Sequence, residues 1–197
     1  MNSKLETRNS KLRVAIFGGS GYGGSELLRI LLLHPNAEIV FVTANEHAGK
    51  PVSEVHRNLL GLTELKFIKA PEDLESLNDL DCAFFALPHG QAMDVAPRLP
   101  ASVKLIDLSG DFRLRDGEVF AAHYGREHKA IDAQAEFVYG LTETNREVIK
   151  AARCIANPGC FATATLLGLA PLVASNLLSC RIIVDAKTGS SGSGAKA

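Results

Sequence analysis

The sequence has almost no net charge and few cysteines, and both shortages narrow its class. Its 21 Lys and Arg nearly balance 22 Asp and Glu, which leaves a net charge of -1 at pH 7. This balance gives no support for a nucleic-acid partner. The four cysteines form no CxxC pair and have no histidines at metal-ligand spacing. We therefore expect no metal site and no disulfide framework, and a reducing, cytoplasmic setting fits this usage.

Long hydrophobic runs and targeting segments are also missing. Residues 1–10 are polar and mixed in charge, which predicts a disordered tail rather than a signal peptide or anchor. The longest apolar stretch, residues 161–178, is interrupted by polar residues and a proline, so it predicts a helix packed within a protein and no membrane span. With 197 residues, of which 46% are hydrophobic, the chain is expected to be globular, with one domain and part of another.

Short apolar segments alternate with helical ones along the chain. The alternation is typical of an α/β protein with a Rossmann-like, doubly wound parallel sheet, in which ligands lie beyond the carboxyl ends of the strands. We expect a dinucleotide-binding domain at residues 11–155 and the start of an α+β catalytic domain at residues 156–197. The predicted strands are residues 12–17, 38–43, 82–87, 103–108 and 181–186, and the predicted helices of the first domain are residues 25–33 and 91–98.

A glycine-rich loop follows the first predicted strand. Residues 18–24 read Gly-Gly-Ser-Gly-Tyr-Gly-Gly and lead into the helix predicted at residues 25–33. Glycines let the backbone turn sharply and approach a pyrophosphate, and the N–H groups of the helix start can bind it. A glycine turn without a ligand is the alternative, but the strand, loop and helix order favours a dinucleotide.

The end of the second predicted strand leaves the nucleotide type open. Thr43 and Asn45 could receive the 2′-phosphate of NADP, whereas Glu46 could reach the ribose hydroxyl of NAD. Glu46 could equally be a solvated loop residue.

Cys160 is the candidate nucleophile. It follows Pro158 and Gly159 and opens an apolar helix, so it lies at or beside the helix N-terminus. Unpaired N–H groups and the positive end of the helix dipole favour a thiolate there, and the thiolate is the nucleophilic form. A buried core cysteine is the ordinary alternative. The other three, which adjoin apolar strands, are interpreted as structural: Cys82, Cys154 and Cys180.

Three further side chains follow predicted strands. Arg113 offers a planar fork suited to a carboxylate or phosphate, although it could be a plain surface arginine. Glu143 is either a substrate contact or a helix cap. His89 is interpreted as shaping its loop or contacting the cofactor rather than as an acid or base. The other five histidines are interpreted as ordinary surface residues.

Six segments together resemble the N-acetyl-gamma-glutamyl-phosphate reductase family of arginine biosynthesis. They are residues 18–29, 86–90, 106–114, 139–141, 156–163 and 190–194. The resemblance implies an NADP-dependent oxidoreductase in which Cys160 attacks an acyl phosphate, phosphate leaves, and NADPH reduces the resulting thioester to a semialdehyde. It also implies a small-molecule substrate, inorganic phosphate and a homo-oligomer, with no membrane partner.

The candidate site combines the residue chemistry with this resemblance. Cys160 is the catalytic residue. The substrate contacts are Arg113, Asn157 and Glu143. The NADP(H) contacts are Gly18, Gly19, Ser20, Gly21, Tyr22, Gly23, Thr43, Asn45, Leu87, Pro88, Ser191 and Gly192. Two alternatives stay open: an enzyme of the aspartate-semialdehyde dehydrogenase type, and a truncated nucleotide-binding module without catalysis.

The resemblance also implies a C-terminally truncated reductase. Members of the family continue for well over a hundred further residues, which include their acid–base histidine. We expect this chain to need that portion for turnover, and we expect the helix at residues 161–178 to leave apolar surface exposed.

Overall fold

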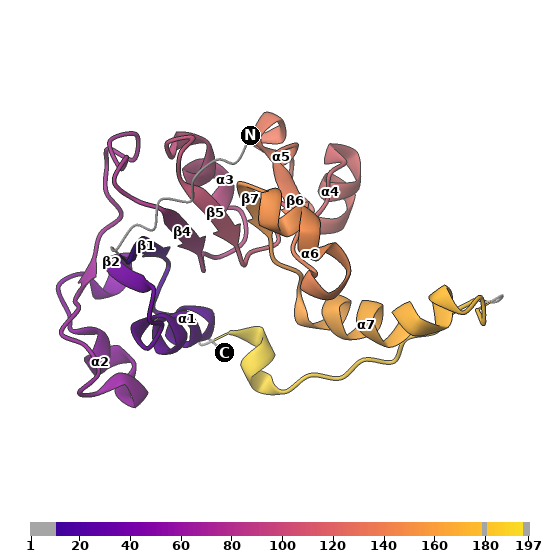
Figure 1. Ribbon diagram of the computed structural model, residues 1–197, viewed down its shortest axis with the longest axis horizontal. Coiled ribbons are helices and arrows are strands. Elements are labelled where there is room, and N and C mark those ends of the chain that lie inside the picture. Colours follow the sequence, from indigo (N-terminus) through magenta and orange to yellow (C-terminus); the bar gives the residue numbers. More distant parts are fainter. Residues whose placement is uncertain (1–10, 179–180, 195–197) are drawn as a thin grey trace, which may run out of the picture.

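Seven parallel strands in one sheet organise the molecule (Figure 1). The computed structural model describes residues 11–178 and 181–194, so the predicted tail at residues 1–10 lies outside the described residues. The strand order is β3-β2-β1-β4-β5-β7-β6, and each neighbouring pair of strands is parallel. The predicted α/β fold with a doubly wound parallel sheet is confirmed.

The predicted strands and helices of the first domain are present, with shifted ends. Glycines 23 and 24 are already helical, so the first helix begins earlier than expected, and the helix predicted at residues 91–98 divides into a short α-helix and a 3₁₀ turn that contains Pro97. The strands are β1 Leu12–Phe17, β2 Ala37–Thr43, β3 Phe67–Ile68, β4 Cys82–Phe85, β5 Lys104–Asp107, β6 Phe137–Tyr139 and β7 Cys154–Ala156. The helices are α1 Tyr22–Leu32, α2 Val52–Val55, α3 Ala92–Val95, α4 Gly117–Tyr124, α5 Ile131–Gln134, α6 Thr142–Ala151 and α7 Cys160–Ala174, with 3₁₀ turns η1 Asn45–His47, η2 Arg57–Leu59, η3 Ala96–Arg98 and η4 Ser190–Ser193.

Both faces of the sheet are covered, as expected for parallel strands joined by helical crossovers. Phe17 points into one core cluster with Phe85, beneath α3 and α4. Its neighbour Ile16 points the other way and packs with Leu28 of α1 and Phe67 of β3. Figure 1 shows α1 and α2 on one side of the sheet and α3, α4 and α5 on the other. Because the faces are filled, ligand access is at the strand ends.

The strand predicted at residues 181–186 is wrong. These six residues are extended, exposed and outside any sheet, and Ile183 is 87% exposed. Apolar, β-branched residues favour a strand only where another strand can accept the backbone hydrogen bonds. No neighbouring strand occurs beside them in the described part of the chain.

Helix α7 projects away from the sheet (Figure 1) and leaves its apolar side chains in solvent. None of its residues is buried, and Phe161, Leu166 and Val173 are between 43% and 58% exposed. The prediction of a helix packed within the protein is therefore wrong for this chain, and the expectation of exposed apolar surface on the helix is confirmed. None of the helices in the described ranges combines the length and apolar character needed to cross a bilayer.

Candidate functional site

The sheet order creates a crevice where strands β1 and β4 lie side by side. From β1 the chain moves outward to β2 and β3, and from β4 it moves the other way to β5. Open α/β sheets bind ligands at such a reversal, beyond the carboxyl ends of the strands. A pocket of about 240 Å³ lies there, lined by Gly23, Ala86, Leu87, Pro88, His89, Leu108 and Ser109.

The glycine loop after β1 is shaped for a close ligand. Gly18 has a φ of +84°, which favours glycine, and a Cβ at Gly24 would lie only 2.4 Å from the carbonyl oxygen of Gly19. A Cβ at Gly23 would enter the pocket between Ala86 and Leu108. Since Gly21 is the N-cap of α1, the unpaired N–H groups of this 11-residue helix begin at the same loop. The loop therefore fits the phosphate groups of a dinucleotide.

Thr43 supports the loop from behind. Its side chain is 3% exposed, and its hydroxyl oxygen accepts a hydrogen bond from Gly18 N–H at 3.1 Å. Its carbonyl oxygen accepts from Gly19 N–H at 2.7 Å. The expectation that this hydroxyl faces a ligand phosphate is therefore corrected, because the side chain is directed inward. Asn45, in contrast, is exposed at the start of η1, and its side-chain oxygen accepts from Ala70 N–H at 3.3 Å.

His56 is a site residue that sequence reasoning missed. It was interpreted as an ordinary surface histidine, but it is only 8% exposed. Its Nε2 donates to the carbonyl oxygen of Gly19 at 2.8 Å, and its ring lies edge-on to Phe67. Because a carbonyl oxygen can only accept, Nε2 carries a proton. The two residues are 37 positions apart, so no local pattern could have revealed the contact.

Asp107, the last residue of β5, and Asp111, on the loop that follows, are two further residues that sequence reasoning missed. Asp107 is fully buried and accepts hydrogen bonds from the backbone N–H and the hydroxyl of Ser109. Burial raises the pKa of Asp107 to about 6, although the Ser109 hydrogen bonds oppose this shift. Asp111 is 1% exposed, and its carboxylate accepts backbone hydrogen bonds from Gly90, Ala92 and Met93.

His89 does shape its loop. Its Nδ1 accepts a hydrogen bond from Gly110 N–H at 2.7 Å, which ties the loop after β4 to the loop after β5. Arg126 donates from Nη1 to the carbonyl oxygen of His89 at 3.1 Å. The predicted contacts Leu87 and Pro88 line the pocket next to it.

Cys160 is the first residue of α7, with Gly159 as N-cap, and its side chain is exposed. The prediction that it lies at a helix N-terminus is confirmed. Strand β7, which delivers it, lies between β5 and β6, so the cysteine turn shares an edge with the loops after those strands. Asn157 N–H donates to the carbonyl oxygen of Asp107 at 2.7 Å and fixes the start of the turn.

Arg113 lies against the cysteine turn. Its Nε donates to Asn157 O and its Nη2 to Leu108 O, both at 2.8 Å. Its Nη1 lies beside Gly159, at 3.1 Å from where a Cβ would stand. The positive charge of Arg113 is therefore held beside Gly159, the residue before Cys160.

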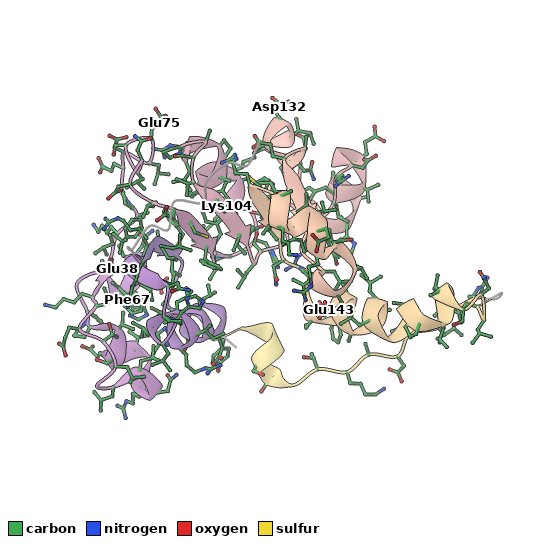
Figure 2. The ribbon with its side chains drawn as sticks, viewed as in Figure 1. Glu38, Phe67, Glu75, Lys104, Asp132 and Glu143 are labelled. Carbon is green, nitrogen blue, oxygen red and sulfur yellow. The ribbon has the colours of Figure 1, made fainter. Side chains whose placement is uncertain are left out.

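Glu143 lies in the first turn of α6, directly after edge strand β6. Figure 2 shows it near the start of α7 in this view. Its side chain is exposed, and Oε2 accepts from the Thr142 hydroxyl at 3.1 Å. The structure thus brings Glu143, Asn157 and Arg113 to the edge that carries Cys160.

The remaining cysteines differ from Cys160. Burial raises the pKa of Cys82 to about 12 and that of Cys154 to about 11, so both thiols hold their protons near neutral pH. This supports their structural interpretation, and Cys180 lies outside the described residues.

The remaining predicted cofactor contacts divide into two groups. Ser20 is half-buried within the glycine loop, and Tyr22 is 55% exposed at the start of α1. Ser191 and Gly192 belong to η4, where Gly192 N–H donates to Gly189 O at 3.0 Å. Within residues 11–178 and 181–194, the hydrogen bonds of this turn do not reach the glycine loop.

The chain is similar in sequence to curated proteins that share one name. The chain is 50% identical over 188 residues to N-acetyl-gamma-glutamyl-phosphate reductase of Nitrosococcus oceani and 51% identical over 188 residues to that of Acidithiobacillus ferrooxidans. Each alignment covers 94% of this chain and 54% of the relative, so the chain spans about half the length of the curated relatives it matches.

Solved structures are similar in fold. Aspartate semialdehyde dehydrogenase with NADP from Candida albicans aligns with a TM-score of 0.55 at 15% identity, over 84% of this chain and 48% of that one. The enzyme from Francisella tularensis aligns with the same TM-score at 14% identity, over 84% of this chain and 41% of that one.

Two family models cover most of the sequence. Residues 160–197 match the model of the semialdehyde dehydrogenase dimerisation domain, which begins at the candidate nucleophile. Residues 13–152 match the model of the semialdehyde dehydrogenase NAD-binding domain, and this range contains the glycine loop, the pocket and Arg113. With that match over more than half of its length, the chain belongs to the semialdehyde dehydrogenase family.

Proposed function

We propose that this chain provides the nucleotide site and the nucleophile of an NADP-dependent N-acetyl-gamma-glutamyl-phosphate reductase of arginine biosynthesis. The observation that supports this most strongly is the turn that presents Cys160, exposed, at the start of α7 with Arg113 beside it. The same sheet edge carries the glycine loop and its pocket. Relatives of that name share about half of the residues with this chain.

The glycine loop and the pocket would hold the cofactor. Backbone N–H groups at the start of α1 would bind its pyrophosphate, and Leu87 and Pro88 would form a wall of the pocket. Asn45, exposed beyond the end of β2, would accept the 2′-phosphate, so we propose NADP(H) rather than NAD(H). When bound, NADPH supplies the hydride for the reduction.

Cys160 would form the covalent intermediate. Its thiolate sulfur attacks the carbonyl carbon of the acyl phosphate, the bond from carbon to the phosphate oxygen breaks, and phosphate leaves to give a thioester. After hydride addition to the same carbon, the carbon–sulfur bond breaks, which releases the semialdehyde and restores the thiolate. Backbone N–H groups in the first turn of α7 would stabilise the tetrahedral oxyanion.

The charged residues around the cysteine would orient the substrate. Arg113 could donate hydrogen bonds from its Nη1 to the negatively charged phosphate, because its Nε and Nη2 already anchor the side chain to the backbone. Glu143 and Asn157 are exposed at the same edge and would offer an acceptor and an amide to the N-acetylglutamyl portion.

The test is phosphate-dependent reduction of NADP with N-acetylglutamate semialdehyde, followed by absorbance. It is run with the 197-residue chain alone and with this chain joined to the downstream half of the Nitrosococcus relative. We expect turnover from the joined protein. Turnover by the chain alone would support the reaction but contradict the expected need for a downstream portion.

Variants decide the role of the cysteine. Cys160→Ser should abolish turnover and leave nucleotide binding intact, whereas Cys82→Ser should keep most activity. An active Cys160→Ser variant would remove the nucleophile assignment. Turnover of aspartate semialdehyde alone would instead assign the related dehydrogenase, and nucleotide binding without any turnover would favour a binding module.

We also propose a cytoplasmic homo-oligomer. The dimerisation-domain match covers residues 160–197, and the apolar side chains of α7 are exposed in the single chain. A second copy would remove this surface from water.

A further inference from the structure

Asp111 holds three backbone donors of a neighbouring loop. Its carboxylate accepts from Gly90 N–H at 2.7 Å, from Ala92 N–H at 3.0 Å and from Met93 N–H at 3.4 Å. The side chain is 1% exposed, so these bonds replace the water that a carboxylate otherwise needs. The donors precede and begin α3, so the end of the loop after β4 depends on a side chain from the loop after β5.

The loop that Asp111 holds is a wall of the pocket. Leu87, Pro88 and His89 line the pocket and lie directly before Gly90. At the start of the loop, Ala86 N–H donates to Phe17 O at 2.8 Å, which joins it to β1. The three pocket residues are thus fixed at one end by β1 and at the other by Asp111.

The hydrogen bond from Gly110 N–H to His89 determines which nitrogen of the His89 ring is protonated. A backbone N–H can only donate, so Nδ1 of His89 carries no proton. The neutral ring therefore holds its proton on Nε2, and a pocket-lining side chain becomes a hydrogen-bond donor of fixed type. Gly110 thus sets the tautomer of His89, and Asp111 sets the position of the loop that carries it.

We propose that Asp111 is a positioning residue for the nicotinamide dinucleotide. It holds residues 87–90 in the conformation that lines the cofactor pocket. It does so by binding backbone N–H groups of this loop and of α3, and not by contact with the ligand. This inference rests on the proposed function of the pocket. It predicts that a change at Asp111 weakens cofactor affinity in molecules that are still folded.

The first experiment is NADPH titration of the 197-residue chain and its Asp111→Asn variant by calorimetry. Asparagine keeps the size of the side chain but removes the charge and one acceptor. We expect the Kd to rise about tenfold or more at full stoichiometry, since hydrogen bonds to charged groups are individually strong. A purely structural role would lower the stoichiometry and leave the Kd of the folded fraction unchanged. Asp94→Asn is the control, because Asp94 is exposed and pairs with Lys129.

A second variant perturbs the same loop at Gly90, a hydrogen-bond partner of Asp111, and leaves the Asp111 side chain unchanged. Gly90 has a φ of +93°, which alanine adopts only with strain, and a Cβ there would displace the Arg126 guanidinium, so Gly90→Ala should also raise the Kd. Gly61→Ala is its control, because Gly61 has a φ of +78° but open space around it. This pair decides the question if Asp111→Asn does not fold.

The outcomes separate the two proposals. If the unaltered chain binds neither NADPH nor NADH, the proposed function fails and this inference fails with it. If the unaltered chain binds and the Asp111→Asn or Gly90→Ala protein binds with the same Kd, the positioning role alone is overturned. A raised Kd in both variants, with both controls unchanged, supports it.

Discussion

Replacing Asp107 with Asn should change how stability depends on pH. Asp107 is fully buried at the end of β5, where its carbonyl oxygen also accepts the N–H of Asn157 at the cysteine turn. Desolvation raises the pKa of Asp107 from 3.8 to about 6, and the nearby charge of Asp111 adds to the rise, whereas Ser109 and Arg113 lower it. The raised value means that burial favours the protonated carboxyl.

The sign and size of the effect follow from these values. Between pH 4 and 6 the unfolded chain has Asp107 ionised while the folded chain keeps it protonated, so the folded state binds more protons. Its contribution to stability is therefore fully present below pH 3.8 and is lost as pH rises through about 6. A shift of roughly 2 pKa units corresponds to about 3 kcal/mol. Asparagine does not titrate, so the variant should lack this loss.

The assay is urea unfolding of both proteins between pH 4 and 7.5, followed by circular dichroism. The free energy of unfolding of Asp107→Asn, minus that of the unaltered chain, should increase by roughly 2.4 kcal/mol across the range, because part of the effect falls below pH 4. Taking this difference cancels groups that titrate alike in both proteins. Asp79→Asn, at an exposed surface ion pair, controls for the general loss of one carboxylate. A difference that stays constant with pH would refute the argument.

Three other predictions concern the loop, the thiols and α7. Gly24→Ala should weaken NADPH binding more than tenfold, because a Cβ there meets the Gly19 backbone, whereas Gly168→Ala, in open space, should bind normally; calorimetry gives both values. In a Cys180→Ser background, iodoacetamide at pH 8 should label Cys160 well before the half-buried Cys82 and the buried Cys154, as read by peptide mass spectrometry, and equal rates would contradict the burial argument. Light scattering should show an oligomer, or a hydrophobic dye should bind, because α7 exposes apolar side chains; a monomer that binds no dye would contradict this expectation.

The sequence alone was enough for features that arise from neighbouring residues. Alternating apolar strands and helices predicted the parallel sheet, and the glycines at positions 18–24 predicted the loop after β1. The Pro-Gly turn predicted that Cys160 starts a helix. Each of these depends on backbone preferences and hydrophobic periodicity within about a dozen residues, which a sequence displays directly.

The tertiary structure decided the features that join distant segments. It gave His56 a place behind the glycine loop, turned Thr43 inward, and placed Asp111 under a loop 21 residues away. It also left residues 181–186 without a strand partner among residues 11–178 and 187–194. Hydrogen bonds between loops depend on which strands become neighbours in the sheet, and burial depends on what covers each side chain. Local backbone preferences encode neither of these. The glycine loop could therefore be predicted from the sequence, but the distant residues that hold it and its neighbouring loop in place could not.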